Sequence, residues 1–339
     1  MKLRNWALLA VFSVSAVGVG AGAAEKTAAR KADQKTAKVE KKLEAFTDAE
    51  KAGPALKVQG EYEGKAGSSK VGIQVIALGG DMVRAVFYRG GLPGAGAEGK
   101  AAAEVEAKSQ DGKVVFKGQS YNATLADGKL TGKTDKGESF EAKKVIRKSP
   151  TLGLKPPAGA TVLFDGSNAD AFNNGKMTDQ KLLMMGAVTK RNFKDFTLHV
   201  EFILPFMPDA RGQARANSGV YLQNRYEVQI LDSFGLKGLN NECGGIYTVE
   251  APKVNMCLPP LQWQTYDIDF TAAKFDASGK KTANAKVTVK LNGVLIHEGF
   301  EIPKKTGGGS AEGPTAGPIQ LQNHGNPVYF RNVWVVEKK

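Results

Sequence analysis

Apolar and polar residues alternate in short runs along most of the chain, a period that predicts β-strands rather than helices. Between residues 55 and 147 the alternation is clear at 71–75, and the dipeptides Asp111-Gly112 and Asp127-Gly128 are typical of hairpin turns. These residues predict a small antiparallel β domain. It offers no histidine, no cysteine and no clustered acids between its strands, so we assign it no chemistry.

The same alternation continues over residues 161–339. At 198–204 leucine, valine and phenylalanine share one parity and Glu201 has the other, and 226–230 repeats this pattern with Glu227 on the polar side. Seven or more such strands, separated by turns and without a long amphipathic helix, predict a β-sandwich or jelly roll. The expected fold class is therefore all-β, a jelly-roll sandwich preceded by the small β domain.

The N-terminus has the pattern of a secretory signal. Lys2 and Arg4 precede an apolar run from Trp6 to Val19, and small residues follow it, which predicts a signal peptide over 1–24. The run is too short to cross a bilayer comfortably, although an uncleaved anchor is the alternative. We expect a secreted, periplasmic or cell-envelope protein.

Composition divides the rest of the chain. Residues 25–54 are rich in alanine and lysine and are expected to form a solvated spacer, and the prolines of 148–160 indicate a linker. The expected domains are thus the β domain at 55–147 and the sandwich at 161–339.

Charge is unevenly distributed. The formal net charge is +13, and residues 1–160 hold 27 Lys and Arg against 17 Asp and Glu. The basic excess therefore lies outside the sandwich, and together with the expected export this argues against nucleic-acid binding. Association of the basic N-terminal part with an anionic polymer of the cell envelope is left open. Cys243 and Cys257 are the two cysteines. In an exported chain we expect a disulfide between them, with free thiols or metal ligands as alternatives.

Polar residues recur on the parity opposite the core in the second half of the chain. Because side chains alternate across a strand, they are candidates for one shared, wet sheet face. The alternative for each is a solvated or purely structural position. The residues are His199, Glu201, Glu227, Gln229, Gln322, His324 and Arg331.

Several blocks in this half resemble the 3-keto-disaccharide hydrolase domain family, over about residues 160–337. The blocks, in order, are Asn217–Tyr221, Tyr226–Asp232, Gly244–Tyr247, Trp263–Tyr266, Leu291–Val294, Leu321–Gly325 and Phe330–Val333. The resemblance implies a concanavalin A-like sandwich that acts on oxidised glycosides in exported or surface proteins. The family often has Asp where this chain has Asn323, so an acid that assists catalysis or binds a cation would be missing there.

Cleavage of a 3-keto glycoside needs a base for the C2 hydrogen, an acid for the leaving oxygen and a donor for the enolate. Carboxylates and histidines suit these roles, whereas an ordinary glycosidase uses two carboxylates. We expect Glu227, His324 and Glu201 to be catalytic. Expected substrate contacts are Gln229, Asp232, Tyr247, Gln322, Arg331 and Trp263.

The predicted function is an exported hydrolase that cleaves glycosidic bonds of 3-keto disaccharides or related glycosides, by elimination and hydration. A non-catalytic, lectin-like carbohydrate-binding module is the alternative, with Trp263 as its aromatic platform. The partner is a small-molecule sugar. No metal site is expected from the histidine spacing, and a divalent cation such as calcium, held by Asp165, Asp170 or Asp232, is the one cofactor left open.

Overall fold

The computed structural model describes residues 43–339, and nearly all of their regular structure is β-strand. The expected all-β class is therefore confirmed. The expected signal peptide and the spacer up to residue 42 lie outside the described residues. Within 43–339 no helix is both long and apolar enough to cross a membrane.

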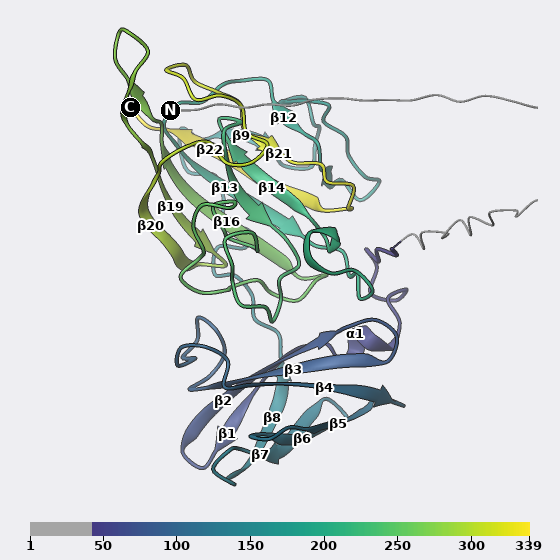
Figure 1. Ribbon diagram of the computed structural model, residues 1–339. Helices are drawn as coiled ribbons and strands as arrows, with labels where there is room; N and C mark the ends of the chain where they lie inside the picture. Colours follow the sequence, from purple (N-terminus) through teal and green to yellow (C-terminus); the bar gives the residue numbers. More distant parts are fainter. Residues whose placement is uncertain (1–42) are drawn as a thin grey trace, which may run out of the picture. The chain divides into compact units, whose positions relative to one another are not determined.

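The first group of strands closes into an eight-stranded antiparallel barrel (Figure 1). Sequence alternation predicted the strands but not the closure. A short helix precedes them. The elements are α1 (Pro54–Val58), β1 (Gly60–Ala66), β2 (Ser69–Ala77), β3 (Met82–Arg89), β4 (Ala103–Gln110), β5 (Lys113–Lys117), β6 (Asn122–Ala126), β7 (Lys129–Lys133) and β8 (Ser139–Val145).

Local chemistry explains how the barrel turns and closes. Asp111-Gly112 and Asp127-Gly128 have positive φ at both residues and form the predicted turns between β4 and β5 and between β6 and β7. Closure pairs β1 with β8, where Gly64 lies opposite Ala142. A Cβ at Gly64 would lie 1.9 Å from the Glu141 carbonyl oxygen, so the close approach of these strands requires glycine.

Residues 161–337 form two larger sheets. The seven-stranded sheet has the order β11-β22-β13-β16-β19-β20 with β9 paired to β22, and the five-stranded sheet has the order β10-β12-β21-β14-β15. The larger sheet comprises β9 (Thr161–Phe164), β11 (Leu183–Met184), β13 (Phe196–Ile203), β16 (Trp263–Thr271), β19 (Ala285–Leu291), β20 (Val294–Ile302) and β22 (Tyr329–Glu337). The smaller comprises β10 (Phe172–Asn173), β12 (Val188–Thr189), β14 (Ser218–Leu222), β15 (Tyr226–Ile230) and β21 (Gln320–Leu321). A 3-10 turn, η1 (Gly212–Ala214), and the pair β17 (Lys274–Phe275) and β18 (Lys281–Ala283) complete the region.

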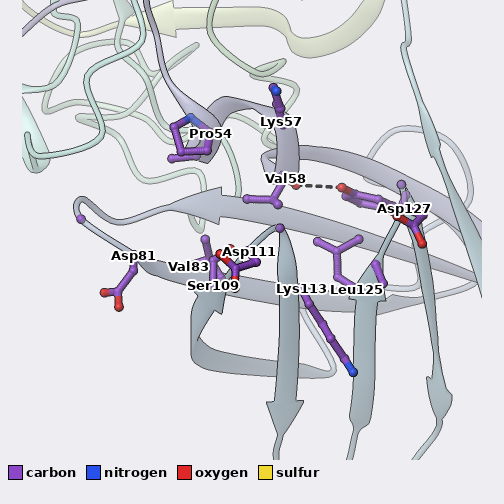
Figure 2. A pocket seen from close by; sticks show the side chains of 16 residues that line it. Pro54, Lys57, Val58, Asp81, Val83, Ser109, Asp111, Lys113, Leu125 and Asp127 are labelled. Atoms are coloured by element: carbon purple, nitrogen blue, oxygen red, sulfur yellow. Dashed lines mark hydrogen bonds between the residues drawn. The ribbon is translucent and has the colours of Figure 1, made fainter.

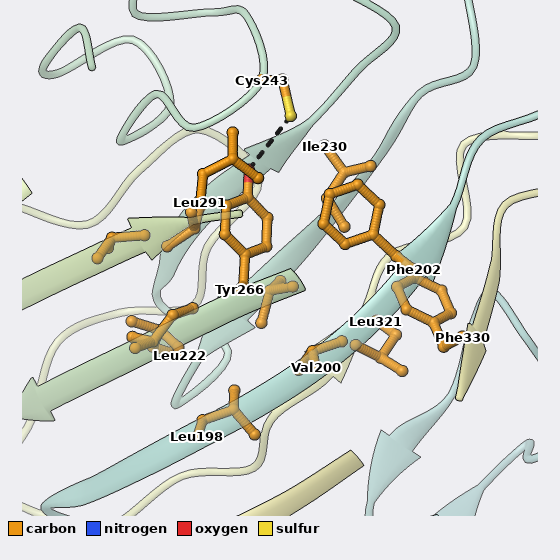
Figure 3. Close-up of a cluster of buried hydrophobic side chains, with 14 of the residues drawn as sticks. Leu198, Val200, Phe202, Leu222, Ile230, Cys243, Tyr266, Leu291, Leu321 and Phe330 are labelled. Atoms are coloured by element: carbon orange, nitrogen blue, oxygen red, sulfur yellow. Dashed lines mark hydrogen bonds between the residues drawn. The ribbon is translucent and has the colours of Figure 1, made fainter. Parts of the chain in front are cut away.

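One apolar core lies between these two sheets. Val200 and Tyr266 come from the larger sheet and Leu222, Ile230 and Leu321 from the smaller, and all are at most 1% exposed (Figure 3). The parity assigned to the core from sequence is confirmed for these strands. The finer jelly-roll, concanavalin A-like topology stays a prediction.

The end of the expected spacer is packed at two points rather than solvated throughout. Phe46 exchanges backbone hydrogen bonds of 2.9 and 2.8 Å with Phe206, and Ala52 is 5% exposed. Most other residues of 43–54 are exposed, so the expectation of a solvated spacer fails only at these contacts.

The two cysteines are free thiols, so the expected disulfide is absent. Cys243 Sγ lies 3.4 Å from the Tyr266 hydroxyl (Figure 3). Cys257 Sγ lies 3.5 Å from the Leu231 carbonyl oxygen. Both side chains are at most 1% exposed. Burial raises the pKa of Cys257 well above its ordinary value, which keeps that thiol protonated in the core.

A cavity of about 810 Å³ lies at one end of the barrel. Val58, Val83 and Leu125 give it an apolar lining, and Asp111 and Asp127 stand at its edge on hairpin turns (Figure 2). The whole lining comes from residues 54–128. This cavity therefore contains none of the residues that the sequence proposed for catalysis.

Candidate active site

The hairpin of β14 and β15 carries the central candidate residues. Its turn residues Gln223 and Asn224 have φ of 54° and 55°, and Arg225 N donates to the Leu222 carbonyl oxygen at 3.0 Å across the turn. The register places Tyr221 opposite Glu227. Both side chains have the parity opposite the apolar core, so they share the outer face of the five-stranded sheet.

Two segments cover this outer face: the residues around Tyr247, and residues 306–309, which we call the covering segment. Tyr247 N donates to the Glu227 carbonyl oxygen at 3.1 Å, and Glu227 N donates to Thr306 Oγ1 at 2.8 Å. Glu227 is consequently 2% exposed and Gln229 1% exposed. The solvated-face alternative is therefore wrong for both residues, because segments distant in sequence fold over this strand.

Glu227 lies in a pocket shaped by its neighbours on β14. Its Oε2 accepts a hydrogen bond of 2.8 Å from the Tyr221 hydroxyl. A Cβ at Gly219 would lie 2.2 Å from its Oε1, so glycine makes room for the carboxyl group. Burial raises the pKa of Glu227 to about 7, and the Tyr221 hydrogen bond opposes this rise. A carboxyl group with such a pKa can both accept and donate a proton near neutral pH.

The Tyr221 hydroxyl links this carboxyl group to the covering segment. It lies 2.8 Å from Glu227 Oε2 and 2.7 Å from the Gly307 carbonyl oxygen, and Gln322 Nε2 donates to it at 3.5 Å. A phenol has one proton, so it can donate to Glu227 or to Gly307 but not to both. When Glu227 is protonated it can donate to Tyr221, which then donates to Gly307. Both charge states of Glu227 therefore have a consistent hydrogen-bond arrangement.

A network of amides surrounds Gln229, and sequence reasoning missed most of it. Gln229 Nε2 donates to Gln213 Oε1 at 3.0 Å, and Asn217 Nδ2 donates to the same oxygen at 3.1 Å. Gln213 Nε2 in turn donates to the Asn241 carbonyl oxygen at 2.8 Å. Gln213 and Asn241 lie on irregular segments with no strand alternation, so no parity argument could have found them.

Three further candidates differ in their contacts and in their burial: Gln322, Tyr247 and His324. Gln322 shares the Tyr221 hydrogen bond described above. Tyr247 is half-buried, and a Cβ added at Gly307 would lie 3.2 Å from its ring, so the ring packs on the covering segment. His324 is exposed on the loop after β21. Its catalytic role stays a prediction.

Glu201, Arg331 and Trp263 belong to the other sheet. Glu201 on β13 pairs in register with Arg331 on β22, and Arg331 Nε donates to Glu201 Oε2 at 2.7 Å. The guanidinium carbon of Arg331 lies 4.0 Å from the centre of the Trp263 ring. The hypothesis of one shared surface for all candidates is therefore wrong, because parity shows which side of a strand a residue takes but not which sheet.

The surroundings of Glu201 are those of a structural anchor. Gly153 N donates to Oε1 at 2.5 Å and Asn332 Nδ2 donates to it at 2.8 Å, while His199 Nε2 lies 3.6 Å away. Burial by itself would raise the pKa of Glu201, but His199, Asn332, Arg331 and Gly153 together lower it to about 2. Its carboxylate holds the linker residue Gly153 against the larger sheet.

Asp232 also has a structural role, because it forms a buried ion pair with Arg215. Arg215 Nε donates to Asp232 Oδ2 at 2.7 Å, and both residues are at most 5% exposed. Its expected contact with substrate is therefore not supported. No group of three or more His, Cys, Asp or Glu side chains within 43–339 is arranged to hold a metal ion. Asp165 is an exposed turn residue bonded to Ser167, Asp170 is also exposed and Asp232 is paired with Arg215, and the calcium ion that was left open stays a prediction.

Comparison with known proteins agrees with this picture of the second half of the chain. The profile of the 3-keto-alpha-glucoside-1,2-lyase-like domain matches residues 159–336. The chain belongs to this family. The matched range contains both larger sheets and every candidate residue, and it confirms the resemblance seen in the sequence. A search of the curated proteins finds no match.

Two solved structures are similar to about half of this chain. A candidate glycosyl hydrolase from Parabacteroides distasonis ATCC 8503 is 33% identical, with a TM-score of 0.50, and the alignment covers 54% of this chain and 85% of that one. A second candidate glycosyl hydrolase from the same organism is 18% identical, with a TM-score of 0.40 and coverage of 53% and 95%.

Proposed function

We propose that this protein cleaves the glycosidic bond of 3-keto disaccharides or related 3-keto glycosides, with Glu227 as the group that moves the proton. The observation that carries the proposal is the Glu227 carboxyl group, which is buried beside Tyr221 and has a pKa of about 7. Membership of the lyase-like family and the likeness to a candidate glycosyl hydrolase support the substrate class.

The chemistry follows from the ketone at C3 of the sugar. The ketone acidifies the C2 hydrogen, so the Glu227 carboxylate takes that proton and an enolate forms. The C1–O bond then breaks with its electron pair on the leaving oxygen, which receives a proton from the Glu227 carboxylic acid. Water finally adds its hydroxyl group to C1 and a proton to C2, which makes the overall reaction a hydrolysis.

Other polar groups on this face would orient the sugar. We assign Gln229, Gln322 and Tyr247 to contacts with sugar hydroxyl groups, because they lie on the same face as Glu227 or on the segments that cover it. Since Glu227 is 2% exposed, the covering segment at 306–309 must move away from Glu227 for substrate to enter. Three consecutive glycines at 307–309 allow the backbone to change conformation at a low free-energy cost.

The proposal is tested by offering the purified protein a 3-keto glycoside and its unoxidised parent in deuterium oxide. We expect turnover of the keto compound alone, with one deuterium at C2 of the released sugar. Cleavage of both compounds without deuterium at C2 would indicate an ordinary glycosidase instead. Saturable binding without turnover would establish the lectin-like alternative.

Two further parts of the proposal need their own measurements. His324→Ala should lower turnover if His324 assists at the leaving oxygen, and unchanged turnover would remove it from the mechanism. Export is proposed on the N-terminal sequence, and fractionation of cells that express the full chain would test it.

Tyr221→Phe should shift the pH dependence of the reaction. The variant loses the hydroxyl donor that opposes the raised pKa of Glu227, so the pKa should rise above about 7. The ionised base would then form only at higher pH, and kcat/KM at pH 7 should fall about tenfold. A pH–rate profile measures this shift. Tyr329→Phe, at a half-buried position of the other sheet, is the matched control and should keep the wild-type profile.

A further inference from the structure

A second polar site lies away from Glu227, around a cavity of about 100 Å³. Arg84, Arg211, Arg215 and Asp232 line it together with apolar side chains that include Ile76 and Phe234. Three arginines and one aspartate give this lining a formal charge of +2. Arg211 is exposed, whereas Arg215 is 5% exposed, so Arg215 is the charged group that is costly to bury unless its donors find acceptors.

Two of the three arginines are paired with carboxylates, and Arg84 has a second carboxylate partner in Glu104 at 3.5 Å. Arg84 pairs with Glu106 at 2.7 Å, and Arg215 pairs with Asp232 at 2.7 Å. Arg211 has carbonyl oxygens as its hydrogen-bond partners, namely those of Leu78, Pro208 and Ala210. Carbonyl oxygens carry only partial charge, so they do not neutralise a guanidinium group.

Arg215 supplies an independent sign of a missing acceptor. Its Nε bonds Asp232, and its Nη1 donates to the Ala77 carbonyl oxygen at 3.2 Å. Its Nη2 is buried and has no hydrogen-bond partner among residues 43–339, and the whole residue is 5% exposed. A buried charged donor that makes no hydrogen bond is rare and unfavourable.

The electrostatic environment of Arg211 agrees with this. Burial and the neighbouring charges of Arg215 and Arg84 lower the pKa of Arg211, and Asp209 and Glu106 offset this only in part. Arg215 and Arg84 therefore act on Arg211 as neighbouring like charges.

We propose that this cavity binds a tetrahedral oxyanion such as phosphate or sulfate, held by Arg211 and Arg215. Guanidinium groups match the geometry of such anions and form strong, charge-assisted hydrogen bonds with them. The volume suits one small anion and excludes a disaccharide, so the site is distinct from the proposed sugar site.

The site would also stabilise the segment next to Gln229. Arg211 and Arg215 flank η1, and Gln213 within η1 accepts the hydrogen bond from Gln229. A bound anion therefore fixes both ends of the turn that holds this amide network.

The test is a titration of the purified protein with inorganic phosphate at constant ionic strength, followed by thermal unfolding and by isothermal calorimetry. We expect saturable stabilisation by phosphate and none by chloride. Arg211→Gln should weaken phosphate binding at least tenfold, whereas Arg191→Gln, an exposed arginine paired with Glu337, should bind like the wild type. These readouts need no catalytic activity, so failure here leaves the proposed function untouched.

A double variant tests the same site independently, in case Arg211→Gln does not fold. Arg215→Gln combined with Asp232→Asn removes the buried pair while keeping an amide hydrogen bond, and it should abolish the saturable effect. Comparing phosphate with glucose 6-phosphate shows whether the oxyanion is free or carried on a sugar. Equal effects of chloride and phosphate, or equal phosphate binding by Arg211→Gln and the wild type, would overturn the proposal.

Discussion

Replacing Glu227 by glutamine should lower kcat/KM on a 3-keto glycoside by about 10³-fold while leaving the protein folded. Glutamine keeps the shape of the side chain and a hydrogen bond to Tyr221, but it cannot take the C2 proton. The burial that raises the pKa of Glu227 also means that the neutral amide is tolerated well at this position. Steady-state kinetics measure the fall in kcat/KM, and a thermal unfolding curve shows whether the variant is folded.

The pH dependence gives the same experiment a second readout. The carboxylate is the active form of the base, so wild-type kcat/KM should fall as pH drops below about 7 and should level off above it. The matched control is Glu298→Gln, because Glu298 is an exposed strand residue whose ion pair with Lys253 is also exposed. If Glu227→Gln keeps more than a tenth of the wild-type rate, Glu227 is not the base.

The alternation of apolar and polar residues was sufficient to predict the strands, because the strands place one face in an apolar core. The parity of Val200 and Tyr226 predicted burial correctly, and Asn292-Gly293 forms the turn between β19 and β20 with φ of 53° and 78°. Barrel closure was not predictable in the same way. It depends on the pairing of β1 with β8, which are far apart in sequence.

The candidate site shows the same limit. Glu227, Gln229 and Gln322 lie on one sheet face, as their parity suggested, but Glu201 and Arg331 take the same parity on the other sheet. Parity is a property of one strand, whereas membership of a sheet is set by long-range pairing. Gln213 and the segment 306–309 follow no alternation, so only the folded chain brings Gln213 to Gln229 and Thr306 to Glu227.

The distinction between Glu227 and Glu201 leads to the second large effect, which concerns stability. Glu201→Gln should lower the free energy of unfolding by about 2 kcal/mol, because it removes the buried charge that accepts hydrogen bonds from Gly153 N, Asn332 Nδ2 and Arg331 Nε. Urea unfolding measures the loss. Glu337→Gln removes an exposed ion pair with Arg191 and should cost less than about 1 kcal/mol.

The pH dependence of stability identifies the cause. The folded-state pKa of Glu201, about 2, lies below its ordinary value of 4.5, so its contribution is fully present above pH 4.5 and is lost as pH falls toward 2. The wild type should therefore lose more stability than Glu201→Gln over that interval. Measured where it is still folded, Glu201→Gln should keep kcat/KM within about threefold of the wild type, whereas Glu227→Gln should not. A loss of turnover in a folded Glu201→Gln protein would return Glu201 to the catalytic machinery and remove its assignment as an anchor.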